Sequence, residues 1–145
     1  MKRFSQFVCL ILIVAIYLTT PALTAGNVDQ KASSYFGKGS VYLWKVSSTQ
    51  FQVWFDVTAV NTMDELGASK ITVERSTDEV NWESMKTYTK EDYSQMIAKN
   101  TFMHSDCVTY TYTSGYYYRA VVTLYAKNSS GYALSTHVTP TLDLR

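Results

Sequence analysis

A strict alternation of apolar and polar residues over positions 51–60 constrains the fold of this chain more than any other feature. The apolar positions fall on one face: Phe51, Val53, Phe55, Val57 and Ala59. The remaining positions fall on the other: Gln52, Trp54, Asp56, Thr58 and Val60. Side chains on a strand alternate between two faces, whereas these apolar positions would scatter around a helix. The segment is therefore predicted to be a β-strand with one buried face.

A second alternating segment occupies positions 117–127, and its apolar face collects five residues: Tyr118, Ala120, Val122, Leu124 and Ala126. Shorter runs are rich in the residues that fit a pleated sheet, and they cover 41–46, 70–76, 82–88, 107–112 and 132–138. Turn residues separate these runs, as expected for short antiparallel strands. The sequence predicts an all-β fold over 41–140, a seven-stranded antiparallel sandwich, followed by a tail over 141–145.

One segment between the predicted strands has helical spacing. Thr89 is a candidate N-cap, and Asp92 three residues later approximates a capping box. Tyr93 and Met96 would share one face of such a helix. Residues 89–100 are therefore predicted to form either a short helix or an ordered loop.

The N-terminus reads as a secretory signal. Lys2 and Arg3 precede an unbroken apolar run over 7–18, and small residues follow. A run of about twelve residues is shorter than the roughly twenty that span a bilayer as a helix. We expect a helical signal peptide over 1–25, a flexible leader over 26–40 and a secreted protein, either extracellular or associated with the cell surface. Because no second apolar run follows, no membrane anchor is expected in the mature chain.

Two segments resemble fibronectin type III modules of the immunoglobulin-like class. Residues 71–82 (Ile-Thr-Val-Glu-Arg-Ser-Thr-Asp-Glu-Val-Asn-Trp) are similar to a strand–turn–strand of these modules, although Glu79 stands where that turn usually has Gly. Residues 118–131 are similar to their penultimate strand and last turn. The whole chain also resembles small secreted proteins of clostridia, which are Gram-positive bacteria. The resemblance implies an immunoglobulin-like sandwich that acts as a binding or spacer module without catalytic residues.

The charge balance argues against several classes of partner. The chain has 13 Lys and Arg residues against 12 Asp and Glu residues, and it lacks the clustered basic face that nucleic-acid binding needs. We expect a monomer with no nucleic-acid partner and no cofactor. Cys107 is the only cysteine beyond the signal, so no internal disulfide is expected. It is predicted to be a small buried side chain that faces inward from its strand.

Reactive side chains gather in one short stretch that contains His104, Asp106 and Cys107. On an extended strand His104 and Asp106 share one face and Cys107 points to the other. The His104 imidazole would therefore not reach the Cys107 thiol to act as its base, although the two residues are close in sequence. Adding His137 still falls short of the ligand spacing of a zinc site. Two carboxylate pairs, Asp64–Glu65 and Glu91–Asp92, are expected on solvated loops, because a small sandwich rarely builds a glycosidase cleft. We therefore predict no catalytic residue, no metal site and no enzyme.

Trp54 is the candidate binding residue. By the alternation it lies on the polar face of its strand, and exposed tryptophan is enriched at recognition surfaces. It either belongs to such a surface or is covered by the leader or by residues 89–100. Trp44 and Trp82 are expected in the core. One of the tyrosines 116–118 is expected to bond the backbone as a tyrosine corner.

Together these features predict a secreted, non-catalytic interaction module that binds a protein or a glycan through an aromatic-bearing surface. The alternative is a structural protein of the extracellular matrix or cell surface, without a discrete ligand, that associates through exposed strand edges. An exposed Trp54 beside polar neighbours would favour binding, whereas a covered Trp54 beside a flat edge strand would favour the structural role.

Overall fold

A computed structural model describes residues 34–145, and the predicted signal peptide 1–25 and the first part of the predicted leader lie outside the described residues. The strands are β1 (Phe36–Lys45), β2 (Gln50–Ser76), β3 (Glu83–Thr89), β4 (Ile97–Thr111), β5 (Tyr117–Asn128), β6 (Gly131–Val138) and β7 (Leu142–Asp143), with one 3-10 helix, η1 (Ser94–Met96). Every strand pair is antiparallel, which confirms the predicted all-β antiparallel class. In this described part of the chain, no helix has the length and hydrophobicity to span a bilayer.

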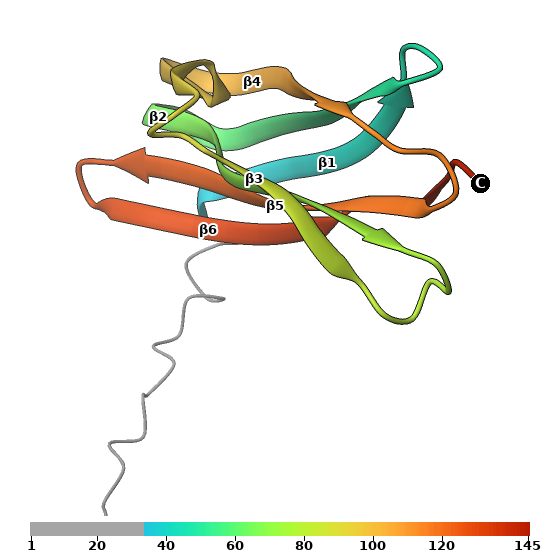
Figure 1. The fold of residues 1–145 in the computed structure, drawn as a ribbon. Coiled ribbons are helices and arrows are strands. Elements are labelled where there is room, and N and C mark those ends of the chain that lie inside the picture. The colour runs from blue at the N-terminus through green and yellow to red at the C-terminus, as the bar shows by residue number, and fades with distance from the viewer. Residues whose placement is uncertain (1–33) are drawn as a thin grey trace, which may run out of the picture.

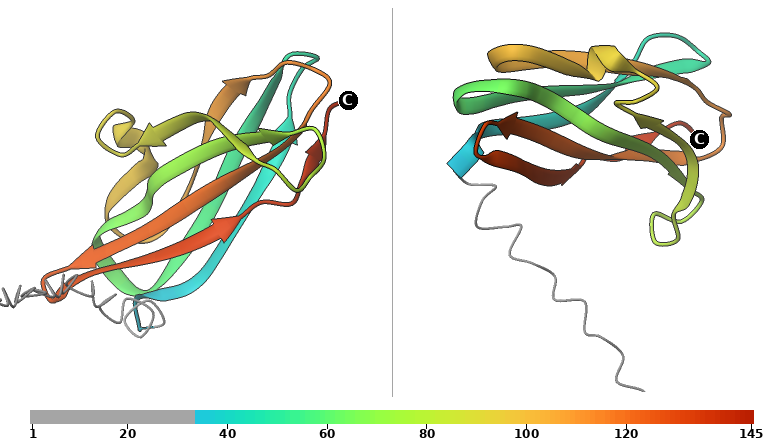
Figure 2. Two further views of the ribbon diagram at one scale, coloured as in Figure 1. Left: turned by 60° about the horizontal axis from the view of Figure 1, so that its bottom comes forward. Right: turned by 90° about the vertical axis from the view of Figure 1, so that its left-hand side faces the viewer.

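The longest strand, β2, connects all parts of the sheet. Its residues 51–59 pair with β1 on one side, and 50–58 pair with β4 on the other. Its residues 65–76 pair with β5, and 70–75 also pair with β3 on the opposite edge. The sheet curls into a half-barrel, so that β1, β4 and the first half of β2 lie over β5 and β6 (Figure 1; Figure 2). One continuous curled sheet thus takes the place of the two separate sheets of the predicted sandwich.

The inward faces predicted from the two alternating segments form the core. In β2, Phe55 has 0% of its surface exposed and Val57 has 2%. In β5, the apolar face of residues 118–126 is buried against them. Burial of a large apolar side chain contributes about 1.5–3 kcal/mol to the free energy of unfolding. The period-two prediction of the faces is therefore confirmed for both segments.

Aromatic side chains fill one end of this core. The ring centroid of Phe51 lies 5.4 Å from the rings of both Tyr110 and Tyr118. The Tyr118 hydroxyl donates a hydrogen bond to the carbonyl oxygen of Thr113 at 2.8 Å. Tyr118 therefore satisfies its polar group while its ring is buried, which is the role predicted for one of the three consecutive tyrosines.

The outer limits of the sheet differ from the prediction at both ends. Strand β1 begins at Phe36, so residues 36–40 belong to the sheet and not to a flexible leader. Near the C-terminus, β7 lies within the predicted tail, where Leu142 pairs with Tyr118. Both additions place backbone hydrogen-bonding groups against an existing strand, which satisfies those groups.

The two predicted strands 51–60 and 70–76 are parts of the single strand β2. Polar residues interrupt the alternation between them, and the sequence pattern therefore suggested a break. Residues 63–67 nevertheless stay extended, because β4 supplies backbone partners along this edge. A register shift between Thr58 and Met63 marks the irregularity that the polar residues introduce.

Residues 90–96 form a turn and η1, which fits the ordered-loop alternative, whereas 97–100 belong to β4; the helix alternative is wrong. The Thr89 hydroxyl donates to the Asp92 carboxylate at 2.8 Å, but the chain turns instead of continuing as a helix. Met96 is fully buried, and its carbonyl oxygen lies where a Cβ on Gly67 would be. Ladder pairing of β4 and the burial of Met96 outweigh the weak helical preference of this segment.

Candidate functional site

The outer face of β1, β2 and β4 is arranged in rows, because directly paired residues on neighbouring strands point to the same side of a sheet. The row order follows from the register of β1 with β2 and of β2 with β4. The row that holds Tyr42 and Trp54 is followed by two rows of mostly polar side chains. The three successive rows are Tyr42–Trp54–Cys107, Ser40–Asp56–Ser105 and Lys38–Thr58–Met103.

Three aromatic side chains on this face, Tyr42, Trp44 and Trp54, form what we call the aromatic platform. Trp44 has 62% of its surface exposed and Tyr42 has 38%, whereas Trp54 is half-buried. The rings of Tyr42 and Trp54 lie with centroids 6.3 Å apart and planes 3° from parallel. The Trp54 indole N–H donates to the side-chain oxygen of Gln52 at 3.0 Å, which holds the indole in place. Trp54, the predicted binding residue, therefore lies near two aromatic residues of β1, Tyr42 and Trp44.

The predicted core positions of Trp44 and Trp82 are both wrong. In β1, Val41 and Leu43 pack against the core, so the alternation turns Trp44 outward. Trp82 is half-buried, and its ring lies 4.1 Å from the guanidinium carbon of Arg119 on β5. This contact is a cation–π interaction that leaves Trp82 outside the core.

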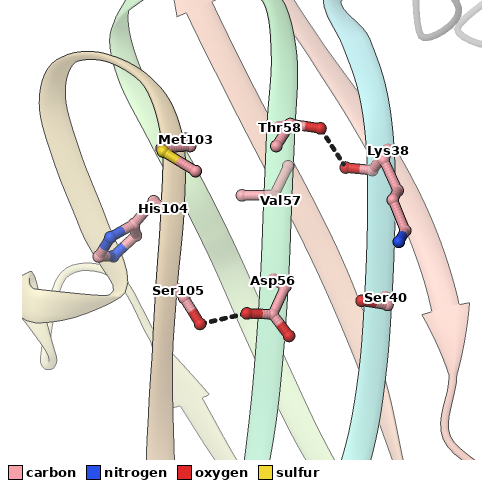
Figure 3. Close-up of a pocket in the computed structure, with 8 residues that line it drawn as sticks. All are labelled: Lys38, Ser40, Asp56, Val57, Thr58, Met103, His104 and Ser105. Carbon is pink, nitrogen blue, oxygen red and sulfur yellow. Dashed lines mark hydrogen bonds between the residues drawn. The ribbon is translucent and has the colours of Figure 1, made fainter.

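A hollow of about 470 Å³ adjoins the aromatic platform on the same face (Figure 3). The Ser105 hydroxyl donates a hydrogen bond to one carboxylate oxygen of Asp56. Among residues 34–145, neither the second Asp56 oxygen nor the Lys38 ammonium group has a hydrogen-bond or ion-pair partner. The hollow thus presents an available acceptor and an available donor. Its lining residues are Lys38, Ser40, Asp56, Val57, Thr58, Met103, His104 and Ser105.

His104 and Asp106 share one side of β4, as the alternation predicted, but that side faces inward, whereas the predicted inward position of Cys107 implied an outward one. The His104 ring meets the Phe55 ring edge-on, with centroids 5.5 Å apart. A ring nitrogen, Nε2, is 2.9 Å from the carbonyl oxygen of Gln95. The Asp106 carboxylate accepts a hydrogen bond from the next backbone N–H in the strand at 2.7 Å. Both side chains therefore have structural partners within the fold.

Cys107 lies on the outer face, so its predicted inward orientation is wrong. It pairs with Trp54 in the register, and its side chain is partly exposed. The buried position belongs to the next residue, Val108, which has 4% of its surface exposed. Burial raises the pKa of the Cys107 thiol, and the nearby Asp106 carboxylate adds to the rise. The thiol is therefore a weak nucleophile next to the aromatic platform.

The remaining reactive side chains are dispersed. Within residues 34–145, no three His, Cys, Asp or Glu side chains lie close enough to share a metal ion. His137 bonds the hydroxyl of Ser135 at 2.9 Å. Glu65 lies in β2 rather than on the predicted loop, and it pairs with Lys90 at 3.6 Å and Lys127 at 3.7 Å. The three candidates His104, Asp106 and His137 are thus not brought together.

The chain matches no protein-family model, and no curated protein matches it. The site therefore has to be interpreted from its own geometry.

The sequence identified Trp54 but missed the residues around it. Tyr42 and Trp44 alternate with Val41 and Leu43, and this pattern is a signal that could have placed both aromatic residues outside the core. Asp56 joins Ser105 only through the register of β2 with β4. No local pattern contains that register, because it depends on where two distant segments pair.

Proposed function

We propose that this protein is a secreted, non-catalytic interaction module whose ligand contacts the aromatic platform. We also propose that its domain is related to the immunoglobulin-like sandwiches of fibronectin type III modules, since the antiparallel sheet is compatible with that fold and two segments resemble it. The observation that carries the functional proposal is the 62% exposure of Trp44, two residues along β1 from Tyr42 on the same sheet face.

The physical chemistry of the platform supports recognition. Exposed aromatic surface is unfavourable in water, and a partner that covers it gains the free energy of that burial. Tryptophan and tyrosine lose few rotamers on binding, and they dominate the energetics of many interfaces. The hydrogen bond from Trp54 to Gln52 reduces that loss further, because the indole is already oriented in the free protein.

Two observations support a non-catalytic role. His104 and Cys107 point to opposite faces of β4, so the imidazole does not face the thiol as a base. The pKa of the Cys107 thiol is raised, which opposes formation of a thiolate nucleophile at neutral pH. The aromatic platform itself carries no group that transfers a proton readily near pH 7.

A retention experiment tests the proposal. The full chain is incubated with insoluble cell envelopes of a Gram-positive bacterium and with collagen-coated surfaces, and bound protein is quantified. We expect retention on at least one, and at least a tenfold loss with Trp44→Ala or Trp54→Ala. The matched control Trp82→Ala, in the turn before β3, should be retained normally. Absence of retention on both, or equal retention of all variants, would contradict the proposal.

The structural alternative has one specific observation in its favour. Among the described residues, β1 pairs only with β2, so its other edge is unpaired. Exposed edges can pair with a second chain. Sedimentation velocity of the full chain across a hundredfold range of concentration separates the two roles. A monomer throughout supports the interaction module, and growing assemblies that survive Trp44→Ala support the structural role.

A further inference from the structure

We infer that the aromatic platform and the adjoining hollow together bind a neutral glycan chain, with one sugar ring against an exposed ring of the platform and the hydroxyl groups of the next sugar in the hollow. This inference rests on the proposed function and names the ligand class of the same surface. It is carried by the combination of exposed aromatic side chains with an unpartnered carboxylate oxygen in adjacent rows of one sheet face.

The aromatic rings suit the apolar face of a pyranose. A pyranose presents C–H groups on its two faces and hydroxyl groups around its edge. The Tyr42 and Trp54 rings stack with planes 3° from parallel and centroids 6.3 Å apart, so a sugar that packs face-on against the exposed side of one ring lies parallel to both. Trp44 extends the aromatic area along β1, which gives a chain of sugars a second stacking position.

The hollow suits the edge of a sugar. Hydroxyl groups both donate and accept hydrogen bonds, and the hollow offers both functions. The unpartnered Asp56 oxygen is an acceptor, the Lys38 ammonium group is a donor, and the hydroxyl of Ser40 can do either. A hydroxyl that donates to a carboxylate forms a charge-assisted hydrogen bond, which is stronger than a neutral one.

The charges favour a neutral ligand over an anionic one. The three rows hold one cation, Lys38, and one anion, Asp56, so the face has no net charge to attract a sulfated or uronic-acid chain. They also argue against an apolar protein surface as the ligand. Such a partner would bury the second Asp56 oxygen without a hydrogen bond, which is unfavourable.

The platform and the hollow are close enough for one extended glycan to contact both. Successive outward residues on a strand are about 6.7 Å apart, twice the rise of roughly 3.3–3.4 Å per residue. The row with Trp54 and the row with Asp56 are therefore one step apart. A linear glycan that follows the strand direction therefore reaches both the platform and the hollow.

The probe is a panel of soluble neutral oligosaccharides: cellohexaose, xylohexaose, mannohexaose, maltohexaose and chitohexaose, each titrated into the full chain. Binding is followed by tryptophan fluorescence and calorimetry. We expect at least one to bind with a dissociation constant below about 1 mM. Trp44→Ala and Asp56→Asn should each weaken binding at least tenfold. The matched controls Trp82→Ala and Asp64→Asn should stay within twofold, because neither residue lines this face.

The outcomes separate this inference from the proposed function. If no oligosaccharide binds while retention on envelopes or collagen still depends on Trp44, the glycan inference is overturned and the interaction module stands. If an oligosaccharide binds equally well to the Trp44→Ala and Asp56→Asn variants, both the inference and the assigned surface are overturned. Asp56→Asn keeps the size of the side chain, and a thermal melt verifies that each variant is folded.

Discussion

Tyr42 in β1 and Trp54 in β2 are direct partners across the sheet, and their rings lie nearly parallel, with planes 3° apart and centroids separated by 6.3 Å. Their meeting depends on the register of the two strands. One position further along, Val41 pairs with Phe55 on the inward face. A slip of one residue would turn the aromatic platform into the core and expose the core residues. The packing of the core therefore fixes the geometry of the outer surface.

Phe55 and Trp44 should respond differently to truncation. Phe55 has 0% of its surface exposed, and replacing a buried Phe with Ala removes its burial energy and leaves a cavity. We expect Phe55→Ala to lower the free energy of unfolding by about 3–5 kcal/mol. Trp44→Ala, at a largely exposed position, should change it by no more than about 0.5 kcal/mol. Urea denaturation measures both, and equal losses would show that the faces of β1 and β2 are misassigned.

Gly67 should tolerate no side chain. A Cβ at this position would overlap the carbonyl oxygen of Met96 and lie 3.1 Å from the His104 ring. We expect Gly67→Ala to destabilise the protein by about 1–3 kcal/mol, as overpacking typically does. Gly37→Ala is the control, since its Cβ would meet its neighbours at 3.5 Å or more. Equal melting temperatures of the two variants would contradict the close approach of the Met96 carbonyl oxygen to Gly67.

Ionisation of Tyr88 should lower the free energy of unfolding at alkaline pH. Burial raises its pKa to about 12, with smaller contributions from Tyr93 and Tyr110, and its hydroxyl donates to the Thr109 carbonyl at 2.8 Å. In the unfolded chain the tyrosine releases its proton at about pH 10. The contribution of Tyr88 is therefore complete below about pH 10 and is lost as the pH rises toward 12.

Denaturation curves between pH 9 and 12 test this expectation. The decline in the free energy of unfolding should be shallower for Tyr88→Phe, because the variant has no proton to release at this position. Tyr132→Phe is the control, since Tyr132 has 59% of its surface exposed. A slope that is the same in Tyr88→Phe and in the unmodified protein would refute the assignment.

Cys107 should react with thiol reagents more slowly in the native protein than in the unfolded chain. It is partly exposed on the outer face, but burial raises its pKa and so lowers the thiolate fraction near neutral pH. The native rate should rise with pH through a midpoint above that of the denatured chain. Because Trp54 is its partner in the sheet, labelling should also change tryptophan emission. A native rate equal to the denatured rate, or unchanged emission, would place the thiol elsewhere.

Much of the fold could be predicted from residues that alternate over long stretches. The faces of 51–60 and 118–126 are as predicted, because burial of one face fixes the pattern in the sequence itself. The continuation of β2 through 61–69 was missed. There the strand is held by backbone pairing with β4 and β5 on its two edges, and backbone pairing leaves little trace in side-chain composition.

The candidate site was predicted only in part. Trp54 was identified because one residue on a regular strand reveals its own face. Trp44 was expected in the core, although Val41 and Leu43 occupy the inward positions of β1. The hollow could not be predicted at all, since Asp56 and Ser105 meet through the pairing of segments far apart in the chain.

The most direct test of the aromatic platform is NMR of the indole N–H groups, since the chain has three tryptophans and each gives one resolved signal. The strongest-binding oligosaccharide of the panel is titrated into the ¹⁵N-labelled full chain. The signals of Trp44 and Trp54 should shift and saturate together, while the signal of Trp82 stays in place. A shift confined to Trp82, or no shift of Trp44 and Trp54 at saturation, would contradict the assignment of this face as the recognition surface.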